Sequence, residues 1–184
     1  MVYLTRRATF SASHYYWNPA WTAEKNEQVF GRCANRHGHG HNYTLEVTVA
    51  GVVDPATGFV VDLKWLKGVI EREVLEAWDH RHLNLDVPEF AAPEFAAPEF
   101  AAPELAAPDL AAKELVAPES AAPARAVLIP TTENLAIAAW RRLEPAISAA
   151  AAGVGARRAS GGARLSRVRV YETPEIFAEY RGEA

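Results

Sequence analysis

The chain has 184 residues, a length that suits one domain with a single sizeable hydrophobic core. Hydrophobic residues make up 49% of it and charged residues 23%, which excludes a fibrous or wholly disordered protein. The formal net charge of −4 argues against a general nucleic-acid binder, because such proteins need clustered positive charge.

Cysteine usage and apolar runs indicate the compartment. The chain carries one cysteine, so an internal disulfide is excluded and a reducing compartment is expected. The first residues, MVYLTRRATFSASH, lack the apolar stretch of a signal peptide, and the most apolar run, AISAAAAGVGA, is too short to span a bilayer. A cytoplasmic protein that does not enter the membrane is therefore expected.

The first half of the chain predicts two strands and a helix. A strand is expected over residues 2–12, and YTLEVTVAG, residues 43–51, alternates apolar and polar side chains as a half-buried strand does. After the turn signal DPATG, FVVDL can form a short strand or lead into the next element. Residues 63–78 change to helical spacing, with an apolar stripe made of Leu63, Leu66, Ile70, Val74 and Trp78.

The second half predicts a helix and two more strands. The helix begins at TTENLAIAAWRRL, where Thr131 or Thr132 can cap it and Glu133 lies in the first turn. Pro145 is expected to end or kink this helix, and the glycine-containing residues 153–163 to form a loop. LSRVRVYET and IFAEYRG then predict two strands. The order of elements predicts an α+β fold, an antiparallel sheet with helices on one face.

Seven pentads, PEFAA PEFAA PEFAA PELAA PDLAA KELVA PESAA, fill residues 88–122 between the two helices. A proline in nearly every pentad forbids a continuous helix, because proline removes a hydrogen-bond donor and clashes with the preceding turn. The composition favours an extended acidic segment over a pentapeptide-type β-helix. We expect one domain, residues 1–184, with a low-complexity insertion at about 88–127.

Alternating histidines in GHGHNY suggest a metal site. His39 and His41 are two residues apart, so on an extended segment they project to the same side. A catalytic zinc needs three protein ligands and one open position, and the best third ligand is His14, at the end of the first strand. His37 would join them if the strand extended further back. The alternative is a set of ordinary surface histidines in a glycine loop.

Other candidate residues offer acid–base chemistry. Cys33 is a metal ligand, a thiol whose pKa is lowered in an electropositive pocket, or a small buried hydrophobe. Asp79 and His80 follow the first helix, where a carboxylate can orient a histidine, or where they only end the helix. Glu172 is an ion-pair partner or an acceptor for the N–H groups of a ligand.

Taken together, these segments resemble the 6-pyruvoyl-tetrahydropterin synthase family, which includes the 6-carboxytetrahydropterin synthases. The resemblance is carried by FSASH, FGRC, GHGHNY, VDPATGFVVDLKWLK, DHRHLNLDVP, TTENLA and VYET, in the family's order. It implies a tunnelling fold, a four-stranded antiparallel sheet with two helices on one face. It also implies a homo-oligomer, trimer or hexamer, with active sites between subunits.

The resemblance assigns a role to each candidate residue. His14, His39 and His41 would bind Zn²⁺, and Cys33 would be the catalytic thiol, with Asp79 and His80 as the catalytic pair. Glu172 would anchor the pterin, near Thr131, Thr132 and Glu133. The pentad repeat departs from the family, where a short connection joins DVP to TTEN.

The implied substrate is 7,8-dihydroneopterin triphosphate, and two products are open. A 6-carboxy enzyme forms 6-carboxy-5,6,7,8-tetrahydropterin, acetaldehyde and triphosphate toward queuosine; a 6-pyruvoyl enzyme eliminates triphosphate alone. The spacing from Cys33 to His39 favours the pyruvoyl type, but the alanine- and arginine-rich composition looks bacterial and tips the expectation to the carboxy product. The remaining alternatives are a cupin-type oxygenase and a non-catalytic zinc-binding family member.

Overall fold

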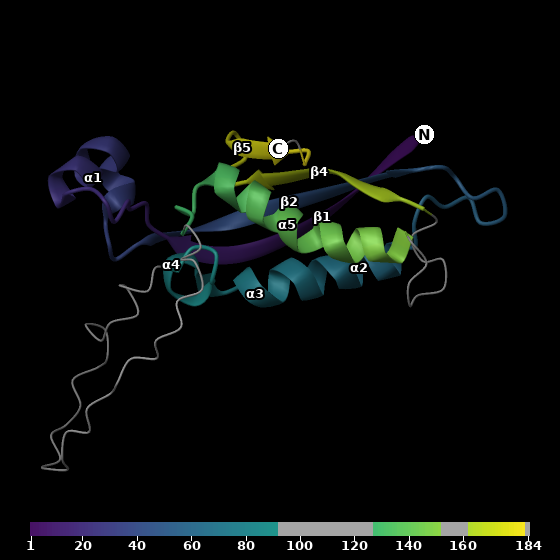
Figure 1. Cartoon of the computed structure of the whole chain (residues 1–184), viewed down its shortest axis with the longest axis horizontal. Coiled ribbons are helices and arrows are strands. Elements are labelled where there is room, and N and C mark those ends of the chain that lie inside the picture. Colours follow the sequence, from purple (N-terminus) through teal and green to yellow (C-terminus); the bar gives the residue numbers. More distant parts are fainter. Residues whose placement is uncertain (92–126, 152–161, 183–184) are drawn as a thin grey trace, which may run out of the picture.

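Two long antiparallel strands organise the fold of the computed structural model, which describes residues 1–91, 127–151 and 162–182. Strand β1 (Val2–His14) pairs along its whole length with β2 (His39–Gly51). On the other side of β2, β4 (Arg164–Tyr171) pairs antiparallel, and β5 (Phe177–Tyr180) pairs antiparallel with β4. The predicted α+β fold with an antiparallel sheet is confirmed (Figure 1).

The sheet has a fifth strand where four were predicted. Strand β3 (Arg81–His82) lies at the edge, parallel to β1 and opposite Ala12 and Ser13. His80 precedes it with a positive φ of 58°, and its N–H donates to the carbonyl of Ser11 at 2.6 Å. A strand of two residues is too short to show an alternating pattern, so the sequence indicated only a turn here.

The helices cover one face of the sheet, as expected (Figure 1). Helix α2 (Leu63–Ile70), a π-helical turn over Glu71–Leu75 and α3 (Glu76–Trp78) make one continuous segment over the predicted range. Leu66, Ile70, Val74 and Trp78 of the predicted stripe are buried, whereas Leu63 in the first turn is exposed. FVVDL is a lead-in, because the Asp62 side chain caps α2 by accepting from the N–H of Lys64 at 2.7 Å.

Helix α5 (Thr132–Ala151) packs beside this segment and runs through Pro145, so the expected end of the helix at this proline is wrong. Proline costs one backbone hydrogen bond to the preceding turn. Leu143 and Ile147, on either side of it, are fully buried, so packing onto the sheet holds both halves of the helix. In the described ranges, no helix is long and apolar enough to cross a membrane.

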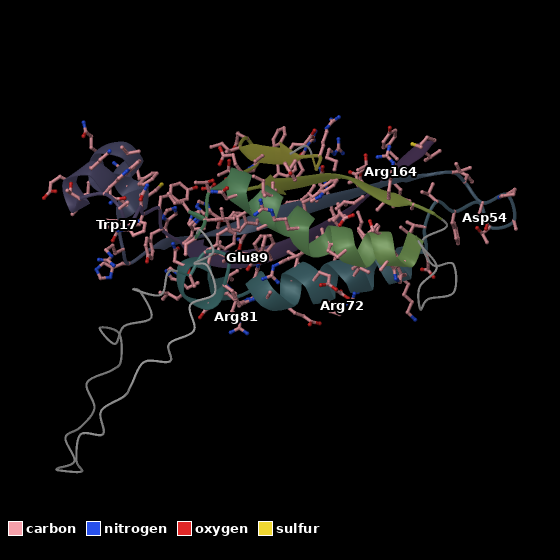
Figure 2. All side chains as sticks on the ribbon, in the orientation of Figure 1. Trp17, Asp54, Arg72, Arg81, Glu89 and Arg164 are labelled. Carbon is pink, nitrogen blue, oxygen red and sulfur yellow. The ribbon has the colours of Figure 1, made fainter. Side chains whose placement is uncertain are left out.

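A small lobe between β1 and β2 was not predicted. It contains α1 (Ala23–Phe30) and a 3₁₀ turn, η1 (Gly31–Ala34), at one end of the sheet, far from Asp54 at the other end (Figures 1 and 2). The one buried residue of α1 is polar: the Asn26 amide donates to the carbonyls of Asn18 and Thr22, both at 3.0 Å. A helix held by such hydrogen bonds lacks the apolar stripe by which helices are recognised.

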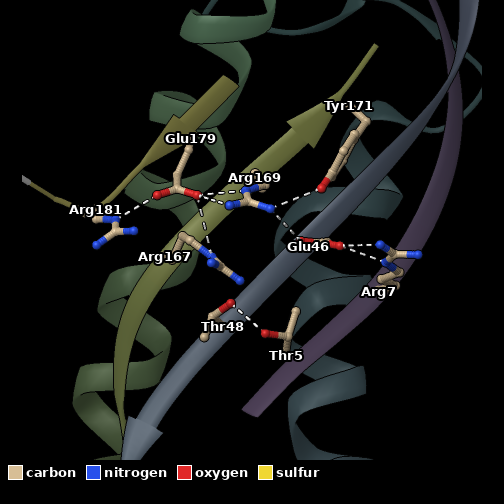
Figure 3. Close-up of polar contacts among 9 residues, drawn as sticks. All are labelled: Thr5, Arg7, Glu46, Thr48, Arg167, Arg169, Tyr171, Glu179 and Arg181. Atoms are coloured by element: carbon tan, nitrogen blue, oxygen red, sulfur yellow. Dashed lines mark hydrogen bonds and ion pairs between the residues drawn. The ribbon is translucent and has the colours of Figure 1, made fainter. Parts of the chain in front are cut away.

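The face of the sheet opposite the helices carries a network of charges (Figure 3). Arg7 donates to Glu46 at 2.7 Å, and Arg169 lies between Glu46 and Glu179, 2.6 Å from the latter. The side chains come from alternate positions on four adjacent strands, so each arginine stands beside a carboxylate. Glu46 is 5% exposed, because the long arginine side chains lie over it.

The first pentad of the repeat is anchored among the helices. Phe90 is 1% exposed, and its ring centroid lies 5.9 Å from that of Trp78. The neighbouring Glu89, labelled in Figure 2, accepts two hydrogen bonds of 2.7 Å from Arg142 on α5. The N–H of Leu128 donates to the Glu89 carbonyl at 3.0 Å. The other pentads, residues 93–122, lie outside the described residues, so the expected extended segment stays a prediction.

Replacing Arg142 with leucine tests the anchor. The Glu89 carboxylate, 10% exposed, would lose the two hydrogen bonds from Arg142, and breaking a buried pair in this way costs about 3 kcal/mol of the free energy of unfolding. Urea denaturation followed by tryptophan fluorescence measures the change. Glu71→Ala, which breaks the exposed pair with Lys67, is the control and should leave the midpoint unchanged. Equal midpoints for all three proteins would contradict the anchoring role.

Candidate metal centre

The pairing of β1 with β2 brings three predicted ligands together. His14, the last residue of β1, lies opposite His39, the first residue of β2, and His41 lies opposite Ala12. Alternate residues share a face, so the three imidazoles project to the helix side of the sheet, beyond Tyr43. Their ring centroids are 4.7, 5.0 and 5.2 Å apart. His37 precedes β2 and is not in this group.

His14 is held in the tautomer that a metal needs. Its Nδ1 lies 2.9 Å from the carbonyl of Pro130, and because a carbonyl can only accept, Nδ1 carries the proton. Its Nε2 therefore presents a lone pair to the cluster, 3.2 Å from the Nε2 of His39. A carbonyl that fixes the ring of a ligand in this way is the usual partner behind a metal-bound histidine.

Burial favours the neutral form of two of these imidazoles, His14 and His39. His14 is fully buried, and burial is the main cause that lowers its pKa to about 4, with a further contribution from His39. The pKa of His39 is lowered as well, first by burial and then by the neighbouring His41. The neutral imidazole is the form that binds metal, so at neutral pH both rings are ready to bind.

Glu172 belongs to the same cluster. It follows β4, and its Oε1 lies 3.1 Å from the Nε2 of His41. Its Oε2 accepts a short hydrogen bond from the Thr132 hydroxyl, at the start of α5, and another at 3.4 Å from the Tyr16 hydroxyl. The ligand atoms of His14, His39, His41 and Glu172 all lie within 4.8 Å of one another.

This donor set fits a zinc ion. A tetrahedron of ligands about 2.05 Å from zinc has edges of about 3.3 Å. The Nε2 atoms of His14 and His39 lie 3.2 Å apart, and the Nε2 of His41 lies 3.1 Å from the Oε1 of Glu172. The Nε2 of His41 is also buried without a hydrogen-bond partner of good geometry, which a metal would relieve.

Tyr16 is a site residue that the sequence did not indicate. Its ring centroid lies 5.0 Å from that of His14, and its N–H donates to the carbonyl of Cys33 at 2.7 Å. Burial, followed by the charges of Glu172, Cys33 and Glu133, raises the pKa of its hydroxyl, so Tyr16 remains a donor. Its position two residues after His14 was the available signal.

Cys33 lies in η1, where its carbonyl accepts from the N–H of Tyr16, but the electrostatics of its thiol differ from the expectation. Burial, and then the negative charge of Glu172, raises the pKa of the thiol, whereas an electropositive pocket would have lowered it. The sequence could not show that a carboxylate would lie close to the thiol. Within this chain, activation of Cys33 therefore requires a positive charge that offsets Glu172.

Asp79 and His80 form a contact pair at the sheet edge. Asp79 accepts from the N–H of Ser11 at 2.8 Å and lies 3.0 Å from the Nδ1 of His80. The Ser11 N–H, followed by His80, lowers the pKa of the Asp79 carboxyl. The exposed His80 ring lines a hollow of about 370 Å³ together with His41. Cys33 is not among the described residues that line this hollow.

The three predicted pocket residues at the start of α5 have different roles in the structure. Thr131 caps the helix, since its hydroxyl accepts from the N–H of Asn134 at 3.4 Å. Thr132 instead points to Glu172, and Glu133 lies in the first turn. Glu172 also lines a second hollow, of about 340 Å³, with Arg7, Asn42, Thr44, Tyr171, Thr173 and Pro174. Of the three predicted pocket residues in this segment, Thr132 is the one that contacts Glu172.

Comparison with known proteins decides the family. The family model described as 6-pyruvoyl tetrahydropterin synthase matches residues 3–183. The chain belongs to this family. Among its relatives in the family, the human 6-pyruvoyl tetrahydrobiopterin synthase is 33% identical over 98% of this chain and 91% of its own length. The Drosophila melanogaster protein of the same name is 47% identical over 50% of this chain and 54% of its own.

Solved structures agree with this assignment. The 6-pyruvoyl tetrahydropterin synthase of Caenorhabditis elegans has a TM-score of 0.66 and 27% identity, covering 99% of this chain and 96% of that one. An uncharacterized protein from Wolinella succinogenes has a TM-score of 0.56 and 18% identity, covering 99% and 98%, and shows the fold alone. The tunnelling fold expected from the resemblance is confirmed.

The lowered pKa of His14 predicts how the metal-free protein responds to pH. Between pH 6.5 and about 4, the unfolded chain binds a proton at His14 that the folded chain does not. The free energy of unfolding should therefore fall by about 3 kcal/mol as the pH drops through this range, and stay high above it. Urea denaturation of chelator-treated protein measures this, and His14→Gln should show a shallower dependence. Parallel curves for both proteins would contradict the assignment.

Proposed function

We propose that the chain is a 6-pyruvoyl tetrahydropterin synthase, which eliminates triphosphate from 7,8-dihydroneopterin triphosphate by an internal redox rearrangement. The convergence of His14, His39, His41 and Glu172 carries the proposal, because it unites a metal-binding group with a carboxylate suited to a pterin. The full-length relatives named 6-pyruvoyl tetrahydrobiopterin synthase support it. They favour the pyruvoyl product over the carboxy product that composition suggested, and the spacing from Cys33 to His39 agrees.

The three histidines would hold Zn²⁺, which when bound polarises the side-chain hydroxyls of the substrate and acidifies the adjacent C–H bonds. Glu172 would accept hydrogen bonds from the aminopyrimidinone edge of the pterin, with Thr132 beside it. Recognition of the flat ring is thereby separated from the chemistry on the side chain, so one carboxylate orients the whole substrate.

Protons would be moved by two groups of the protein. Cys33 would act as a base once a nearby positive charge offsets Glu172, and His80 would act as the second acid–base group, oriented by Asp79. The hollow that joins His41 to His80 gives the substrate side chain a place between them. Thr131 and Glu133 would complete the pterin pocket at the start of α5.

Assembly into a homo-oligomer, a trimer or hexamer, is part of the proposal. Among the described residues, the outer edge of β1 is paired only at Ala12 and Ser13, and β5 has no partner beyond β4. Strand edges of this kind are usually paired or covered, so contact between copies would close the sheets and complete the sites. We propose one catalytic domain, interrupted by the pentad repeat and working in the cytoplasm, with no nucleic-acid or membrane partner.

Product analysis tests the function. The zinc-loaded protein incubated with 7,8-dihydroneopterin triphosphate should release triphosphate and 6-pyruvoyl-tetrahydropterin, identified by mass spectrometry. The formation of 6-carboxy-tetrahydropterin with acetaldehyde would overturn the pyruvoyl assignment while keeping the site. No turnover with the metal bound would favour the non-catalytic family member.

Substitution of the thiol tests the role of Cys33. Cys33→Ala should reduce turnover by about 10²- to 10⁴-fold, the usual contribution of a positioned acid or base, with zinc still bound. Turnover is measured alongside the zinc content of the purified protein. Loss of zinc in this variant would make Cys33 a ligand instead, and unchanged turnover would refute its catalytic role.

A further inference from the structure

We infer that Glu172 is a shared carboxylate: it completes the coordination of the metal while no pterin is bound, and leaves the metal when the pterin binds. This inference rests on the proposed function, in which three histidines hold the ion and Glu172 receives the pterin. It gives one residue two successive partners.

The hydrogen bonds of Glu172 direct one oxygen at the metal centre. Thr132 and Tyr16 both donate to Oε2, which leaves Oε1 facing the Nε2 of His41 at 3.1 Å. That separation is close to the edge of about 3.3 Å between two ligands of a tetrahedral zinc ion. Oε1 therefore has the separation from His41 that a fourth ligand would have, and the Nε2 of His41 has no other acceptor or donor.

The charge of the site also requires a cation. The Glu172 side chain is 14% exposed, and among the described residues neither lysine nor arginine lies within ion-pair distance of it. A partly buried carboxylate without a cationic partner is costly. What Glu172 lacks is a positive charge beside it. A divalent ion bound to all four residues would supply it.

In this arrangement Glu172 cannot serve the pterin at the same time. Both of its oxygens are engaged, so the N–H groups of the pterin must replace existing partners. Release of Oε1 from the metal frees the coordination position that the substrate hydroxyls need. Recognition of the pterin ring would thus open the metal centre, and a bound pterin would weaken metal binding by the same factor as the metal weakens pterin binding.

Metal binding to the full chain tests the first half of this inference. Zn²⁺ affinity, measured by competition with a chromophoric chelator, should be about 10- to 100-fold weaker for Glu172→Gln than for the unsubstituted protein. The visible absorption of the Co²⁺-substituted protein should also change. Glu175→Gln removes an exposed carboxylate from the same turn and is the matched control. It should change neither the Zn²⁺ affinity nor the Co²⁺ absorption.

Equal Zn²⁺ affinity and an unchanged Co²⁺ spectrum in Glu172→Gln would overturn the shared role and leave the proposed function intact. His39→Ala separates the shared role of Glu172 from the proposed function, because it should abolish tight Zn²⁺ binding whether or not Glu172 is a ligand. If His39→Ala kept the metal, the three-histidine site itself, and with it the proposed function, would be wrong.

A pterin titration tests the second half without any substitution. 6-Methylpterin carries the recognition edge but no side-chain hydroxyls, so it cannot replace the carboxylate on the metal. At saturation it should shift the Co²⁺ spectrum of the unsubstituted protein toward that of Glu172→Gln. Binding, followed by pterin fluorescence, with an unchanged spectrum would overturn the inference. Absence of binding would count against pterin recognition and so against the proposed function.

Discussion

The pairing of His14 with His39 across β1 and β2 is the constraint on which the site depends. Side chains on a strand alternate between faces, so a slip of one residue would send His14 to the opposite face from His39 and His41. The register is held by the apolar face of the same two strands, where Phe10 stacks on Tyr43. The core that stabilises the fold therefore also aligns the metal ligands.

Residues at the start of helix α5 contact two side chains of the site that the sheet positions. The Pro130 carbonyl, just before α5, accepts from the His14 ring. The Thr132 hydroxyl, at the start of α5, donates to Glu172. One orients a ligand nitrogen and the other holds a carboxylate oxygen, so the position of α5 affects both halves of the site. The proposed tie between metal binding and pterin recognition would thus depend on the packing of one helix against the sheet.

The sequence predicted the parts of the site that follow a simple period. His39 and His41 share a face because strands repeat every two residues, and His14 ends the strand beside them. It could not predict that Glu172 would lie against His41, because that contact joins separate strands, nor that burial, followed by the charge of Glu172, would raise the pKa of Cys33. Helix α1 and strand β3 were missed because one is held by polar contacts and the other has two residues.

The hydrogen bond between Leu128 and Glu89 bears on how freely the pentad repeat can change in length. It brings together described residues on either side of residues 92–126. Doubling the length of a closed loop costs only about 0.6 kcal/mol. By this measure, a change in the number of pentads would cost little free energy as long as the contact between Leu128 and Glu89 is kept.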